Sequence, residues 1–177
     1  MVLFDNTFLC LLLHPGAKPP ADPETNRPVE KAKERIEHLV QSLEKDRQKI
    51  IIPTPALAEF LVLAGDAGAR YLAELNNSAQ FKIEPFDQIA AVEAAAMERE
   101  ARSLGDKRSG IQETWAKVKF DRQIVAIAKV HGVHTIYSDD DDIEKLTKAL
   151  NIRVVKVAAL PLPPAKQLGL LSPESQI

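Results

Sequence analysis

Short apolar runs alternate with helical patterns along almost the whole chain, and this alternation limits the fold more than any other feature. The apolar runs predict strands at residues 2–4, 50–53, 135–137 and 154–155, and the alternation of apolar and charged residues at 81–84 predicts a further, partly exposed strand. Between them, apolar residues recur at helical spacing, as in Ile36, Leu39, Val40 and Leu43. A strand followed by a helix, repeated, is typical of an α/β protein whose central parallel sheet carries helices on both faces.

Proline marks the segments that lie outside this alternation. The 177 residues suffice for one globular domain with a real core. Five of the 12 prolines lie within residues 14–28, which predicts an irregular loop because proline removes backbone donors. Four more lie between residues 161 and 173. We therefore expect a folded domain at residues 1–158 and an extended tail at residues 159–177.

Composition excludes several classes of protein. The net charge of -2 and the pI of about 6.1 do not indicate a nucleic-acid binder. The single cysteine, Cys10, rules out a disulfide framework and a cysteine-based zinc site, and it favours a reducing, cytoplasmic setting with Cys10 as a small core residue. No apolar run reaches the length of a membrane helix and no basic residue precedes Lys18, so we expect a soluble protein without a signal peptide.

Two helix starts are visible in the sequence. Thr54 and Pro55 follow the second predicted strand, with Thr54 placed to cap a helix and Pro55 in its first turn. Asp87 is placed to cap a helix that follows the third strand. The most apolar helix, residues 124–132, is expected to have Asp121 at its start.

Acidic residues fall where the predicted strands end. Asp5 directly follows the first strand, the run Asp139 to Asp142 follows the fourth, and Glu59 lies in the helix after the second. The carboxyl ends of parallel strands share one edge, where open α/β sheets bind ligands. Carboxylates that converge repel one another unless a cation lies between them, and Mg²⁺ or Mn²⁺ prefers such oxygen ligands. Such a site is suited to phosphodiester hydrolysis.

Each acid also has a purely structural interpretation. Asp5 is placed to cap a helix over residues 7–13. Glu59 suits the solvated face of a helix, where most glutamates lie. Asp121 suits the positive end of a helix dipole. The aspartate run suits a solvated turn. The case for a site therefore depends on the joint placement of the acids.

Four segments together resemble a known family. They are residues 2–7, 52–60, 120–128 and 136–143, and their order and spacing resemble those of PIN-domain proteins, most closely the VapC-like toxin ribonucleases of toxin and antitoxin pairs. The resemblance implies a three-layer α/β/α fold with a parallel sheet of order 3-2-1-4-5. It also implies a ribonuclease that depends on Mg²⁺ or Mn²⁺.

The resemblance further implies which residues form the site. Asp5, Glu59 and Asp121 would hold the metal together with a fourth acid from the aspartate run, which is Asp140 if Ser138 takes the place of the family's usual threonine and Asp139 if the register shifts by one. The candidate metal and supporting residues of this resemblance are Asp5, Glu59, Asp121, Asp139, Asp140 and Asp142, with Asn6, Thr7 and Ser138 in support.

A basic stretch lies beside the third acid. Residues 99–122 contain seven Lys and Arg against four acids. Lys117, Lys119 and Arg122 flank Asp121, which suits contacts with RNA phosphates. The alternative is an ordinary exposed helix surface.

Two functions follow. The first is a Mg²⁺- or Mn²⁺-dependent endoribonuclease, for which the family implies an antitoxin partner bound in the cleft and a homodimer formed through helices near residues 30–75. The second is a catalytically inactive PIN-like module that acts through contacts with protein or RNA, suggested by Asn6 in place of a frequent Thr or Ser and by the additional loop and tail.

Overall fold

The sheet has five parallel strands. The computed structural model describes residues 1–164. In the order β3-β2-β1-β4-β5, the strands are β3 (Phe81–Glu84), β2 (Ile50–Pro53), β1 (Val2–Phe4), β4 (Thr135–Tyr137) and β5 (Arg153–Val155), and every pair is parallel. The predicted order 3-2-1-4-5 is confirmed. It reverses at β1, which has β2 on one side and β4 on the other.

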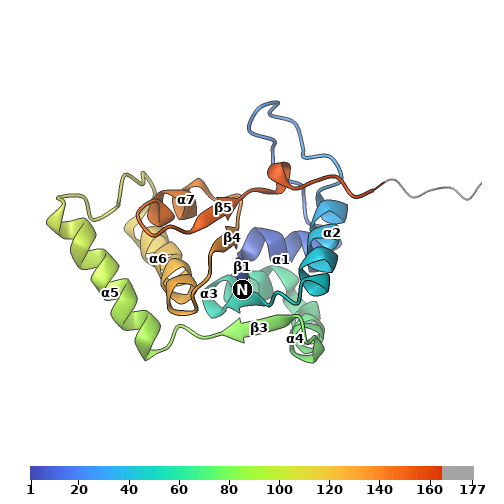
Figure 1. Ribbon diagram of the computed structural model, residues 1–177, viewed down its shortest axis with the longest axis horizontal. Helices are drawn as coiled ribbons and strands as arrows, with labels where there is room; N and C mark the ends of the chain where they lie inside the picture. The colour runs from blue at the N-terminus through green and yellow to red at the C-terminus, as the bar shows by residue number, and fades with distance from the viewer. Residues whose placement is uncertain (165–177) are drawn as a thin grey trace, which may run out of the picture.

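Helices cover both faces of the sheet (Figure 1). They are α1 (Asn6–Leu13), α2 (Ala32–Lys45), α3 (Thr54–Ala64), α4 (Gly68–Asn77), α5 (Gln88–Ser103), α6 (Trp115–Val130) and α7 (Asp141–Thr147), with short 3-10 turns η1 (Gly65–Ala67) and η2 (Val157–Ala159). Helices α5 and α6 pack together at one end of the molecule, and α2 lies at the other. Within residues 1–164, no helix combines the length and apolar character that crossing a membrane requires.

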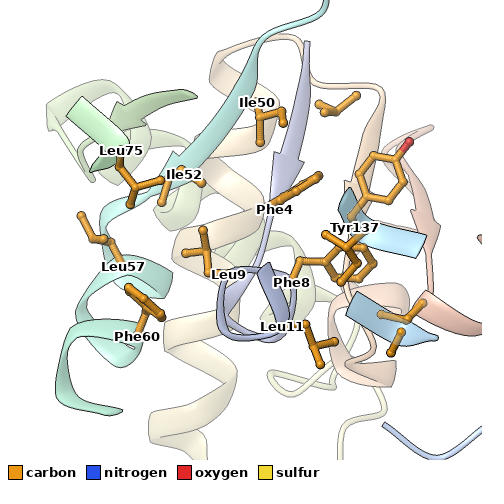
Figure 2. Close-up of a cluster of buried hydrophobic side chains, with 14 of the residues drawn as sticks. Phe4, Phe8, Leu9, Leu11, Ile50, Ile52, Leu57, Phe60, Leu75 and Tyr137 are labelled. Carbon is orange, nitrogen blue, oxygen red and sulfur yellow. The ribbon is translucent and has the colours of Figure 1, made fainter. Parts of the chain in front are cut away.

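Side-chain alternation in the strands divides the core into two. Phe4 points to the face covered by α1 to α4, where it packs against Phe8 and Tyr137 with ring centroids 5.4 Å apart in each pair (Figure 2). Leu3 points to the other face, which is covered by α5 to α7. Both side chains are fully buried. The sheet is therefore apolar on both sides, as the unbroken apolar runs of β1 and β2 require.

The structure confirms one of the two predicted helix caps and shows that the other is wrong. Asp87 caps α5 as expected, accepting from the backbone N–H of Ala90 at 2.9 Å. Thr54 does not cap α3, because the helix begins at Thr54 itself, directly after the extended Pro53. Its hydroxyl instead accepts from the backbone N–H of Phe86 at 3.1 Å, which ties the start of α3 to the segment after β3.

Asp121 also lies elsewhere in its helix than predicted. Helix α6 begins at Trp115 with Thr114 as its cap, so Asp121 lies in the second turn and not at the start. Charged residues interrupt the apolar ones throughout the first two turns of α6, and this hid the beginning of the helix from a search for apolar periodicity.

The proline-rich segment forms a loop between α1 and α2. Its only described pairing is an isolated antiparallel bridge between Ala21 and Pro28. At the other end of the described chain, the Arg35 guanidinium on α2 donates to the carbonyls of Ala158 (3.3 Å) and Leu160, and Leu160 is buried. The chain is thus packed at least as far as Leu160, while residues 165–177 of the predicted tail lie outside the described residues.

Candidate functional site

Four carboxylate side chains from four different elements line one cavity. Asp5 follows β1, Glu59 lies on α3, Asp121 on α6, and Asp140 at the start of α7. The cavity has a volume of about 510 Å³, and Asn6, Thr7 and Lys117 also line it. It lies at the carboxyl edge of the sheet beside β1, where the strand order reverses. This is the position at which open α/β sheets bind ligands.

Pairing of β1 with β4 brings the first acid and its serine together. Phe4 is in register with Tyr137, so the next residues along the two strands, Asp5 and Ser138, are neighbours. The Ser138 hydroxyl donates to Asp5 Oδ2 and accepts from the backbone N–H of Asp140 at 3.0 Å. Ser138 therefore links the first acid to the fourth.

Asp5 both caps a helix and lines the cavity. Its Oδ1 accepts from the backbone N–H of Phe8 at 3.1 Å, at the first turn of α1. Burial raises the pKa of Asp5 to about 7, although the bonds from Ser138 and Phe8 lower it. The structural and the functional interpretations of Asp5 are therefore compatible, and no Lys or Arg of the described residues forms an ion pair with its carboxylate.

Lys117 lies among the remaining acids. Its ammonium Nζ donates to Asp121 Oδ2 at 2.7 Å and to Asp140 Oδ2 at 2.6 Å. Burial lowers the pKa of Lys117, but the bonds to the two aspartates outweigh this and raise it. Even with this partner, burial raises the pKa of Asp121 to about 6. Burial also raises the pKa of Glu59, and the nearby positive charge of Lys117 offsets part of this rise.

The structure separates the acids of the aspartate run. Asp140 lines the cavity, whereas Asp139 turns toward η2, where its Oδ1 accepts from the backbone N–H of Val157 at 3.2 Å. Asp142 pairs with Lys145 at 2.9 Å and lies 3.9 Å from the Lys117 ammonium. Of the two residues left open as the fourth acid, Asp140 is the one placed with Asp5, Glu59 and Asp121.

Asn6 fixes the neighbouring thiol. Its Oδ1 accepts from Cys10 Sγ at 3.2 Å. The Cys10 side chain is half-buried, and burial raises its pKa to about 11, with the charges of Asp5 and Glu59 adding to the effect. A thiol with so high a pKa is a poor nucleophile, in agreement with a packing role.

The three basic residues expected to contact RNA lie in three different environments. Lys117 is inside the cavity, and Lys119 is exposed. Arg122 has only 2% of its surface exposed, and its guanidinium donates to the carbonyl of Lys107 at 3.0 Å and stacks on Trp115 at 5.5 Å. The bond to Lys107 means that Arg122 holds the loop before α6. A guanidinium this deeply buried presents no charge to an RNA phosphate in solvent.

The ion pair between Lys117 and Asp121 was missed at the sequence level. The two residues are spaced i and i+4, which places them on one helix face and favours such a pair. The i, i+4 spacing is visible in the sequence, but the residue at which the helix begins could not be predicted from it.

The donors suit a hard divalent cation in chemistry and charge. All four cavity acids offer carboxylate oxygens, the ligands that Mg²⁺ and Mn²⁺ prefer. The raised pKa values of Asp5 and Asp121 indicate negative charge that is incompletely compensated. As the side chains are placed in residues 1–164, no three carboxylate, imidazole or thiol groups are arranged to chelate an ion, and Lys117 bridges two of the acids.

Fold and site together define a class: a three-layer α/β protein with an acidic pocket at the switch point of its parallel sheet. The chain belongs to the PIN domain family, whose model matches residues 25–149. The match includes Glu59, Asp121 and Asp140, while Asp5 lies before its first residue. No curated protein matches the sequence.

Two solved structures with the same fold are VapBC proteins bound to DNA. VapBC2 from Rickettsia felis, bound to a DNA fragment of its promoter, is 14% identical with a TM-score of 0.54, and the match covers 88% of this chain and 98% of that one. DNA-bound VapBC from Salmonella typhimurium is 14% identical with a TM-score of 0.52, covering 88% and 97%. At this identity the similarity establishes the fold.

Proposed function

We propose that the chain is an endoribonuclease that depends on Mg²⁺ or Mn²⁺ and hydrolyses RNA phosphodiester bonds. One observation carries the proposal: Asp5, Glu59, Asp121 and Asp140 come from four separate elements and line one cavity. Membership of the PIN domain family supports it. Chance placement of four acids at one sheet edge is opposed by their mutual repulsion and by the cost of burying them.

These four carboxylates would hold the ion. A bound divalent cation would polarise a phosphoryl oxygen and lower the pKa of a water molecule. Ser138 orients the Asp5 carboxylate and, through the backbone N–H of Asp140, fixes the start of α7. The exposed Lys119 is available to bind an RNA phosphate, as expected from its position two residues before Asp121.

Net charge does not oppose RNA as the substrate. The chain has 25 acidic and 23 basic residues. If the four cavity acids are neutralised by bound metal, 21 acids remain against 23 bases, so the remaining surface is slightly positive. The acidity of the chain is therefore concentrated where a cation would cancel it.

Cleavage assays test the proposal directly. Structured and single-stranded RNA are incubated with the purified full chain, with Mn²⁺ or with excess chelator, beside Asp5→Asn and Asp121→Asn. We expect cleavage only by the wild type with metal. Activity that survives both substitutions and the chelator would contradict the metal-dependent mechanism. RNA binding without any cleavage would support the inactive module instead.

An antitoxin protein and a second copy of the chain are the proposed partners. The VapBC complexes among the structural neighbours support the first. The homodimer through residues 30–75 is supported by Val62 and Leu63 on α3, which are 82% and 60% exposed. Light scattering should find a dimer for the wild type and a monomer for Val62→Glu, whereas a monomeric wild type would contradict the homodimer.

A further inference from the structure

The ammonium of Lys117 lies where a cation is expected between two of the proposed metal ligands. It is 2.7 Å from Asp121 Oδ2, 2.6 Å from Asp140 Oδ2 and 3.9 Å from Asp142 Oδ2. The three acids come from two different helices, with Asp121 on α6 and the other two at the start of α7. One side chain of this protein therefore supplies a positive charge to the two cavity acids on that side, Asp121 and Asp140.

Within residues 1–164, neither Asp5 nor Glu59 has such a partner. The hydrogen bonds of the Asp5 carboxylate come from Ser138 and from the backbone of Phe8, both of them neutral groups. Glu59 is exposed and feels Lys117 only through its charge. The cavity is thus divided into one half that holds an ammonium and one half that does not.

From this arrangement we propose that Lys117 is an internal cation that competes with the divalent ion for Asp121 and Asp140. The inference rests on the proposed function, because it assumes that these acids are metal ligands. An ammonium at 2.6 to 2.7 Å occupies the oxygen lone pairs that a metal ion needs. A Mg²⁺ ion would approach those oxygens to about 2.0–2.1 Å, so the two cations exclude each other.

The Lys117 side chain has room to leave. It is 37% exposed, and its flexible four-carbon stem allows the ammonium to rotate toward solvent. In the metal-free protein the ammonium stabilises the clustered acids, and metal binding has to displace it. Lys117 thereby lowers the apparent affinity for metal and keeps the metal-free fold stable.

An ordinary surface ion pair is the competing explanation, since exposed pairs often contribute nothing measurable. The two explanations differ in their effect on metal binding. An ion pair outside the metal site leaves metal affinity unchanged when it is removed. A competing cation raises the affinity when it is removed.

Calorimetric titration with Mn²⁺ separates them. Lys117→Met keeps the apolar stem and deletes the charge, and we expect it to bind Mn²⁺ about tenfold more tightly or better, the usual scale for one opposite charge at this range. Lys117→Gln, a smaller disturbance of the cavity, should bind more tightly as well. Lys117→Arg keeps the charge and should bind Mn²⁺ with an affinity close to that of the wild type.

Lys119→Met is the matched control. It removes the same charge from the same helix, but Lys119 is exposed and makes no ion pair among the described residues. We expect its Mn²⁺ affinity to stay within about twofold of the wild type, because an exposed charge is screened by salt. In thermal unfolding without metal, Lys117→Met should melt below the wild type, and Mn²⁺ should raise its melting temperature by more.

The outcomes separate the inference from the proposed function. Mn²⁺ binding that depends on Asp121 but is unchanged or weakened in both Lys117→Met and Lys117→Gln overturns the competition and leaves the metal centre intact. An equal gain in Lys119→Met also overturns it, since the effect would then be one of net charge. Absence of Mn²⁺ binding in all of the proteins overturns both proposals.

Discussion

The Asp5 carboxylate is buried without a cation, and this should reduce stability as the pH rises. Its pKa in the folded chain is about 7 against an ordinary value of 3.8, so the protonated form is favoured by folding. Asp5 therefore makes its full contribution to the free energy of unfolding below about pH 4, and this contribution is lost as the pH rises through 7. Ionisation of Asp5 therefore opposes folding at pH 8.

Asp5→Asn should accordingly stabilise the metal-free protein at pH 8. Asparagine caps helices as well as aspartate does, so the bond to Phe8 is retained. We expect a gain of about 4 kcal/mol at pH 8 and little gain at pH 4, because one pKa unit corresponds to about 1.4 kcal/mol and the pKa of Asp5 is raised from 3.8 to about 7. Urea unfolding in chelator at the two pH values measures it.

The control is the same substitution at the other aspartate cap. Asp87 accepts from the backbone N–H of Ala90 in the same way, but its side chain lies at an exposed position. Asp87→Asn should leave the free energy of unfolding nearly the same at both pH values. A destabilised Asp5→Asn at pH 8 would show that the Asp5 charge is compensated in the folded chain.

Ser138 should contribute more to the free energy of unfolding when Asp5 is charged. Its hydroxyl donates to Asp5 Oδ2 and lowers the pKa of that carboxyl. Ser138→Ala should cost about 1–3 kcal/mol by leaving buried polar groups without a partner. Because the pKa of Asp5 then rises further, the loss should be larger at pH 8 than at pH 5.

Urea unfolding of Ser138→Ala at the two pH values checks this. Ser103→Ala removes an exposed hydroxyl that donates only to the Glu100 carbonyl, so it should change stability by less than about 0.5 kcal/mol. An equal loss at pH 5 and pH 8 for Ser138→Ala would contradict a role in holding the charged carboxylate.

At the scale of elements, all five strands were predictable, β3 from the alternation of apolar and charged residues and the others as short apolar runs. Positions within helices were less so. Asp121 was expected at a helix start because the apolar pattern begins at Ile124, yet α6 begins nine residues earlier, at Trp115. Charged residues interrupt the apolar pattern in the first two turns of α6, and the cap that begins this helix, Thr114, lies in a polar stretch.

The choice among the acids of the aspartate run could not be made from sequence for a related reason. A one-residue shift after β4 exchanges the directions of Asp139 and Asp140. The Asp139 carboxylate accepts from the backbone of Val157, and the Ser138 hydroxyl that accepts from the backbone of Asp140 donates to Asp5. The contacts with Val157 and Asp5 are tertiary, so local pattern carries no information about them.

Helix α6 should also hold the loop before it through Arg122. The guanidinium donates to the Lys107 carbonyl, so Arg122→Met should release residues 105–113. We expect amide hydrogen exchange there to accelerate about tenfold, while the strands exchange as before. Arg102→Met is the control, since Arg102 stacks on the same Trp115 ring but pairs with Glu98 on α5. Unchanged exchange in the loop would contradict this role.

At the scale of the whole molecule, charge is distributed unevenly. A net charge of -2 gave no reason to expect a nucleic-acid substrate, because a sum over the chain hides an acidic centre beside an exposed basic residue such as Lys119. The fold explains the concentration: the parallel strands end at one edge, where the acids that follow β1 and β4 meet those carried by α3 and α6.

A toxin ribonuclease should slow the growth of cells that express it. Wild type and Asp121→Asn are expressed at matched levels, and only the wild type should inhibit growth, because the variant lacks one of the four carboxylates. Optical density and an immunoblot for expression provide the measurement. Equal growth of the two cultures would argue against a toxin role while leaving the metal centre untouched.

The central claim is that acids from separate elements act as one cation site, and Mn²⁺ titration of Glu59→Gln tests it most directly. Glu59 is exposed, so its substitution should not disturb folding. Glu74→Gln on α4, an exposed glutamate remote from the cavity lining, is the control. We predict Mn²⁺ binding weakened about tenfold or more in Glu59→Gln and unchanged in Glu74→Gln. Equal affinity in Glu59→Gln and the wild type would contradict the account.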